Sequence, residues 1–188
     1  MAVEPLEQAI RSTRSILRAV SPDDLGLPTP CASWKVSDLV NHIVGGQFFF
    51  AAAVNGQSPG GDGPPDFAAG DFLGSFDQGC TAAVAAFGAD GAMERTLTLP
   101  FGQMPGSVFV GIAATDTFVH GWDLAKATGQ PTDLEPELAT QLLATVGSFL
   151  PDEARGEDSS GAPFGPKQEA PEGASEADRL AAFLGRTP

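Results

Sequence analysis

The sequence has little positive charge, few cysteines and no long apolar run. Its 188 residues carry ten Lys and Arg against 24 Asp and Glu, a formal net charge of −14. Such a surface repels phosphates and anionic headgroups, so we expect no nucleic-acid or membrane partner. The two cysteines, Cys31 and Cys80, are too few for a disulfide scaffold and match no close-spaced zinc motif. We expect both to be small buried residues rather than reactive ones.

No stretch of the sequence resembles a membrane span or a targeting segment. The most apolar run, residues 43–54, contains two glycines and a glutamine and is too short to cross a bilayer. The first residues, Met-Ala-Val-Glu-Pro-Leu-Glu-Gln, lack the basic start and apolar run of a signal peptide. We therefore expect a cytoplasmic protein. Length and an ordinary apolar content favour one domain over residues 1–188, large enough for a sizeable core.

Apolar residues at helical spacing are the main positive signal in this sequence. They predict helices over residues 4–20, 36–55, 67–87 and 134–150, and a further helix that ends at Gly129. Residues 95–100 alternate like one short strand, followed by a turn at 101–106. We expect residues 57–65 to be a flexible loop, 151–174 to be extended, and 175–186 to form a short helix that docks on the rest. One strand among so many helices predicts an all-α antiparallel bundle.

The helix that ends at Gly129 carries an unusual set of polar residues on its apolar side. At about 100° per residue, Asp116, His120 and Asp123 fall in the middle of the arc that should face the core. Buried carboxylates are costly unless they are paired or bind a cation. A divalent metal with Asp116 and His120 as ligands one turn apart would account for the pattern. An internal His–Asp hydrogen bond without metal is the alternative.

The second histidine of the chain bears on this choice. His42 lies at one edge of the apolar arc of the helix over residues 36–55, and Gly46, one turn later, leaves room for another group to approach. A lone histidine in this position is more often an edge histidine that bonds a backbone carbonyl than a metal ligand. However, the chain has two histidines in all, and both fall on core-facing sides of helices.

Two stretches of sequence carry a family resemblance. Residues 34–42, Trp-Lys-Val-Ser-Asp-Leu-Val-Asn-His, resemble the second-helix signature of DinB-like bundles, in particular the N-terminal domain of mycothiol-dependent maleylpyruvate isomerase. Residues 116–124, Asp-Thr-Phe-Val-His-Gly-Trp-Asp-Leu, resemble the Glu-x-x-x-His-x-x-Asp-Leu of that family. The tail, at 164–166 and 178–186, is similar to the ending of an actinobacterial branch of uncharacterised metal-binding members.

The resemblance implies a DinB-like, up-down four-helix bundle with a long crossover between its second and third helices. It also implies a divalent metal at the open end of the bundle, zinc ahead of nickel, with His42, Asp116 and His120 as ligands. Asp116 stands where the isomerase has Glu, one methylene longer. We expect Asp123, one turn after His120, to orient an imidazole without touching the ion.

Two functions compatible with a metal follow from the resemblance. A metal with three protein ligands keeps positions open, and a metal-bound thiol ionises near neutral pH. The first function is therefore a metal- and mycothiol-dependent transferase or isomerase with an electrophilic small-molecule substrate. The second is a non-catalytic metal-binding bundle that acts through a partner or as a homodimer. Phe118 and Trp122, on the outward side of their helix, would fit an intersubunit patch or a cover by the C-terminal segment. A metal-free helical domain is the third alternative.

Overall fold

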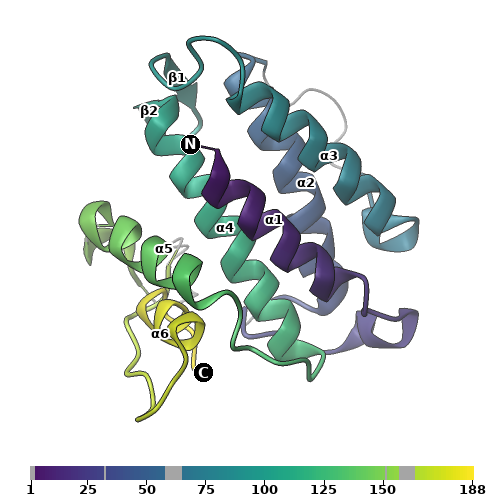
Figure 1. Ribbon diagram of the computed structural model, residues 1–188. Helices are drawn as coiled ribbons and strands as arrows, with labels where there is room; N and C mark the ends of the chain where they lie inside the picture. The colour runs from purple at the N-terminus through teal and green to yellow at the C-terminus, as the bar shows by residue number, and fades with distance from the viewer. Residues whose placement is uncertain (1–2, 32, 58–64, 151, 157–163) are drawn as a thin grey trace.

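The computed structural model describes residues 3–31, 33–57, 65–150, 152–156 and 164–188, and these form a helical bundle with a small hairpin (Figure 1). The helices are α1 (Glu4–Leu17), α2 (Val36–Val54), α3 (Phe72–Phe87), α4 (Gly106–Ala127), α5 (Pro136–Phe149) and α6 (Glu176–Phe183). The strands are β1 (Thr96–Leu99) and β2 (Gly102–Pro105). The predicted fold class is confirmed. Most of the loop predicted over 57–65, and part of the segment 151–174, lie outside the described residues.

Helices α1 to α4 make the bundle, in which α1 packs mainly on α4 and α2 mainly on α3. Helices α2 and α3 run in the same direction (Figure 1). The Asn41 side chain, near the start of α2, accepts a hydrogen bond from the backbone N–H of Ala68, just before α3. At the other end, the Val54 carbonyl of α2 accepts one from Arg95, which follows α3. The end of α2 and the start of α3 therefore lie at opposite ends of the bundle, as the predicted long crossover requires.

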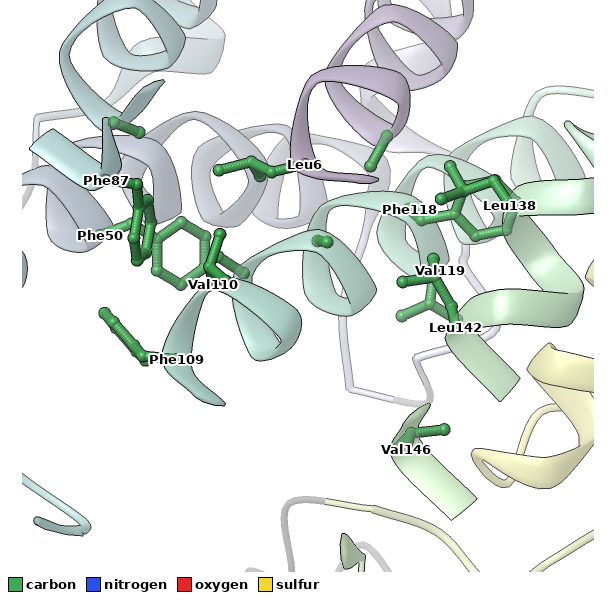
Figure 2. Close-up of a cluster of buried hydrophobic side chains, with 14 of the residues drawn as sticks. Leu6, Phe50, Phe87, Phe109, Val110, Phe118, Val119, Leu138, Leu142 and Val146 are labelled. Carbon is green, nitrogen blue, oxygen red and sulfur yellow. The ribbon is translucent and has the colours of Figure 1, made fainter. Parts of the chain in front are cut away.

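The core is built around α4, which contacts α1, α2 and α5 (Figure 2). At one end, the ring of Phe109 packs edge-on to Phe50, with ring centroids 5.6 Å apart, and lies 5.8 Å from Phe87. Such aromatic pairs contribute about 0.5–1.5 kcal/mol each beyond the area they bury. A second apolar cluster, which includes Val40 and Leu124, fills the opposite end of the bundle.

The hairpin corrects the prediction of a single strand followed by a turn. Residues 102–105 pair antiparallel with β1, with Thr96 opposite Pro105. Leu97 and Leu99 of β1 point into the core, whereas β2 has only Met104 partly buried and its other side chains exposed. The second strand therefore depends on backbone pairing and leaves no apolar alternation in the sequence.

The outward side of α4 is covered by the C-terminal elements. Phe118 and Trp122 are both fully buried. The Trp122 indole Nε1 donates a hydrogen bond to Asp178 Oδ1 of α6 at 2.9 Å. Of the two roles considered for these aromatic residues, the structure shows the cover by the C-terminal segment, and they form no intersubunit patch. Among the described helices, none is both long and apolar enough to cross a bilayer.

Candidate metal centre

Three of the predicted site residues converge at one end of the bundle. Asp116 and His120 lie one turn apart on α4, and His42 lies on the facing side of α2. Asp116 Oδ1 is 3.5 Å from His42 Nε2 and 3.6 Å from His120 Nε2. One ligand atom from each residue lies within 4.8 Å of the others. A Cβ added to Gly46 would lie 3.8 Å from Asp116 Oδ2, an ordinary contact, so an alanine would also fit there.

This geometry fits a divalent cation. A tetrahedral ion with bonds of about 2.0–2.1 Å holds its ligand atoms about 3.3 Å apart, close to the two measured separations. His42 Nε2 is buried and has no hydrogen-bond partner. A buried polar nitrogen without a partner is costly, and coordination to a cation would remove that cost. The Asp116 side chain stays 30% exposed, so the cluster is open to solvent on one side.

The pKa of Asp116 suits a ligand. Burial raises the pKa of this carboxyl group, but the nearby His120 and the contact with His42 outweigh burial and hold the pKa below its ordinary value. Asp116 is therefore ionised at neutral pH, as a metal-binding carboxylate must be.

Asp123 contacts the same histidine from the other side of the ring. Its Oδ2 lies 2.9 Å from His120 Nδ1, and its side chain is fully buried. Burial raises the pKa of Asp123, but Arg186 and His120 lower it further, to about 2. A permanent carboxylate at this distance favours the tautomer in which Nδ1–H donates and Nε2 keeps its lone pair toward Asp116.

Three residues near the site were not predicted as part of it. Arg186 donates to both oxygens of Asp123, from Nε to Oδ1 at 3.2 Å and from Nη2 to Oδ2 at 3.0 Å. Cys31 Sγ lies 3.3 Å from Asp123 Oδ2. The Trp34 ring packs at a tilt against both imidazoles, with centroids 4.7 Å from His42 and 5.8 Å from His120. A buried Asp123 signals the need for a cation, but no spacing rule connects it to an arginine so far along the chain.

Cys31, His120 and Asp123 also lie close enough together to suggest a second metal site. Their contacts argue against one. Arg186 already neutralises Asp123, and its guanidinium would repel a second cation. Burial raises the pKa of the Cys31 thiol to about 12, so the sulfur stays protonated and is a poor ligand. Cys31 is thus partly exposed and not buried as expected, whereas Cys80 is buried. The surroundings of Cys31 nevertheless favour an unreactive thiol.

Comparison with known proteins gives three findings. Residues 6–125 match the family described as the mycothiol maleylpyruvate isomerase N-terminal domain. Two uncharacterised proteins of Mycobacterium tuberculosis, from strains CDC 1551 / Oshkosh and ATCC 25618 / H37Rv, are each 43% identical over 175 residues, which is 92% of this chain and 91% of theirs.

The third finding concerns solved structures. Crystal structures of the mycothiol-dependent maleylpyruvate isomerase and of a histidine-to-alanine mutant share the fold, each with a TM-score of 0.60, at 16% and 15% identity. Each alignment covers 76% of this chain and 66% of the isomerase chain. The chain described here thus spans about two thirds of the isomerase.

Proposed function

This chain belongs to the mycothiol maleylpyruvate isomerase N-terminal domain family, and we propose that it is a metal-dependent enzyme. In this proposal a small thiol attacks an electrophilic substrate, and the enzyme is either a thiol transferase or an isomerase. Mycothiol is the first thiol to test, and zinc is the metal expected ahead of nickel. The ligands are His42, Asp116 and His120. The observation that carries the proposal is the buried, unpartnered Nε2 of His42, which faces the Asp116 carboxylate.

The residues around the cluster have different roles in this proposal. When bound, a divalent ion lowers the pKa of a thiol ligand, so that the thiolate forms near neutral pH. Asp123 fixes the ring of His120, and the exposed part of Asp116 marks the side from which small molecules enter. The indole of Trp34 packs against the imidazoles of both His42 and His120.

The reactive sulfur comes from outside the chain. Cys31 is hydrogen-bonded to Asp123, and its pKa of about 12 keeps it a neutral thiol at physiological pH. Cys80 is buried in the apolar cluster at this end of the bundle. Neither thiol can supply a thiolate nucleophile, and the substitutions Cys31→Ser and Cys80→Ser are expected to leave activity intact.

Cobalt substitution tests the proposal. Protein purified without an affinity tag, stripped of metal and loaded with Co²⁺, is titrated with mycothiol while the near-ultraviolet spectrum is recorded. A cobalt–sulfur charge-transfer band is expected in the wild type and in Cys31→Ser, which shows that the sulfur is that of the added thiol. In His42→Ala the cobalt itself should bind far more weakly.

The two functions give different spectra. If cobalt binds at this site but neither mycothiol nor any other cellular thiol produces the band, the transferase or isomerase is excluded and a non-catalytic metal-binding bundle is left. If cobalt binds equally well to the wild type and to His42→Ala, the ligand set itself is wrong.

A further inference from the structure

The C-terminal tail reaches into the end of the bundle that holds the metal ligands. Arg186 follows α6, and only 12% of its side chain is exposed. Its Nε and Nη2 donate to the two carboxylate oxygens of Asp123, while Nη1 donates to the Leu184 carbonyl at 3.0 Å. Two parallel N–H···O bonds fix the plane of a carboxylate, which a single ammonium group does not.

The same carboxylate holds His120. Asp123 Oδ2, which accepts from Arg186 Nη2, is also the atom 2.9 Å from His120 Nδ1. Fixing the plane of the carboxylate therefore fixes the direction from which the imidazole is held. The opposite nitrogen of that ring, Nε2, is the one that faces Asp116. A chain of direct contacts thus runs from the tail through Asp123 to a metal ligand.

Contacts at the end of α6 hold the backbone of Arg186 in one position. Leu180 of α6 and Leu184, which directly follows α6, are fully buried. Gly185 has a φ of +92°, a conformation that favours glycine, and it reverses the chain after α6. The backbone N–H of Arg186 donates to the Ala181 carbonyl at 3.0 Å.

We propose that Arg186 is a positioning residue of the metal centre, which holds His120 in its ligating orientation through Asp123. This inference rests on the metal site proposed above. Arg186 lies outside residues 6–125, the part that matches the family, so the tail completes a site whose ligands all lie within that part. Coupling of this kind is reciprocal: a docked tail strengthens metal binding, and a bound metal stabilises the docked tail.

Zinc affinity, measured by competition with a chromophoric chelator, tests the inference. Arg186→Met should weaken zinc binding by about 10–100-fold, the usual range for partners of metal ligands. Arg186→Lys keeps the positive charge but loses the two parallel hydrogen bonds of the guanidinium, so a smaller loss of zinc affinity is expected. This second variant also covers the case in which Arg186→Met, which leaves Asp123 buried without a cation, fails to fold. Arg179→Met is the matched control, because Arg179 is half exposed and pairs with Glu176 of the same helix, away from Asp123.

The histidine signals give a readout that needs no metal. The chain contains two histidines, and the spectrum of His42→Ala identifies which ¹⁵N signals belong to His120. In metal-free wild type and in Arg179→Met, the Nδ1–H proton of His120 should be protected from exchange with water. In both Arg186 variants this protection should fall, since the carboxylate that accepts the proton is no longer held.

The two readouts separate the inference from the proposed function. The inference is overturned if Arg186→Lys and Arg186→Met both keep a wild-type His120 signal and bind zinc within about twofold of wild type. Release of a residue that holds a metal ligand should lower zinc affinity by at least about tenfold. Equal losses in Arg186→Met and Arg179→Met overturn it as well. If the wild type binds no zinc, the proposed metal site fails, while the His120 signal still decides whether Arg186 positions the ring.

Discussion

At the scale of single residues, two arginine–carboxylate pairs of similar geometry differ in how far water screens them. Arg186 and Asp123 expose 12% and 0% of their side chains. Arg14 of α1 and Asp77 of α3 expose 44% and 42%, although Nε and Nη2 of Arg14 both lie 2.7 Å from the carboxylate. Because solvent weakens the attraction between exposed charges, only the buried pair is expected to have a large energetic effect.

The exposed pair gives a pH-dependent prediction. The hydrogen bond from Arg14 holds the pKa of Asp77 below its ordinary value of about 3.9. A depressed pKa means that the stabilisation is complete above that ordinary value and is lost as the pH falls through the lower folded-state value. Asp77→Asn should therefore reduce the free energy of unfolding at pH 7 by about 0.2–1 kcal/mol, the range for exposed pairs.

Urea denaturation at a series of pH values measures this effect. The wild type and Asp77→Asn should differ at neutral pH and converge in acid, where the carboxylate of the wild type becomes protonated. A difference that stays constant down to low pH would show that Asp77 acts by packing and not by charge.

At the scale of elements, the contact of α1 with α4 depends on Gly121, which is next to the proposed metal ligand His120. A Cβ on Gly121 would collide with Thr13 Oγ1, the atom that donates a hydrogen bond to the Thr117 carbonyl. Gly121→Ala should thus push the two helices apart and cost about 1–3 kcal/mol, as overpacked cores do. Gly111→Ala is the matched control on the same helix. There the new Cβ would lie 3.5 Å from Thr145, so helix propensity should make it neutral or stabilising by up to about 1 kcal/mol.

Urea midpoints of the two alanine variants measure the contrast. The prediction requires them to move in opposite directions or, at the least, only Gly121→Ala to lose stability. Equal midpoints would mean that α1 can shift away from α4 at little cost.

The elements also show what the sequence could and could not predict. Helical periodicity predicted the bundle helices, because each places a continuous apolar stripe against its neighbours. The juxtaposition of Asp116 and His120 followed from one turn of helix. Strand β2 was missed, since its side chains are mostly exposed. The role of the outward face of α4 could not be predicted. Helices α5 and α6 cover this face, so α4 is buried nearly all round and has no clear polar side.

The partner of Asp123 was missed for a different reason. Arg186 lies 63 positions away in the chain, and its approach depends on how α6 docks and on the turn at Gly185. Contacts of this kind are set by tertiary packing, on which local periodicity carries no information. Sequence analysis could show that a buried carboxylate needs a cation, but only the fold shows which one.

At the scale of the whole molecule, the site joins segments that are far apart in the sequence. The loop with Cys31 and Trp34, helices α2 and α4, and the tail with Arg186 all meet at one end of the bundle. A metal that binds this assembled cluster and not the unfolded chain must stabilise all of these segments together.

Thermal unfolding measures this linkage. With free zinc at about 100 times the dissociation constant, the wild type should gain about 2.7 kcal/mol. For a domain of this size that corresponds to a rise in Tm of about 5–10 °C. His42→Ala should lose most of the rise. Each protein is compared with itself with and without a chelator, so any difference in intrinsic stability cancels. An equal rise in the Tm of His42→Ala would place the bound zinc elsewhere. If a wild type shown to bind zinc has no rise in Tm, the metal does not distinguish the folded cluster from the unfolded chain.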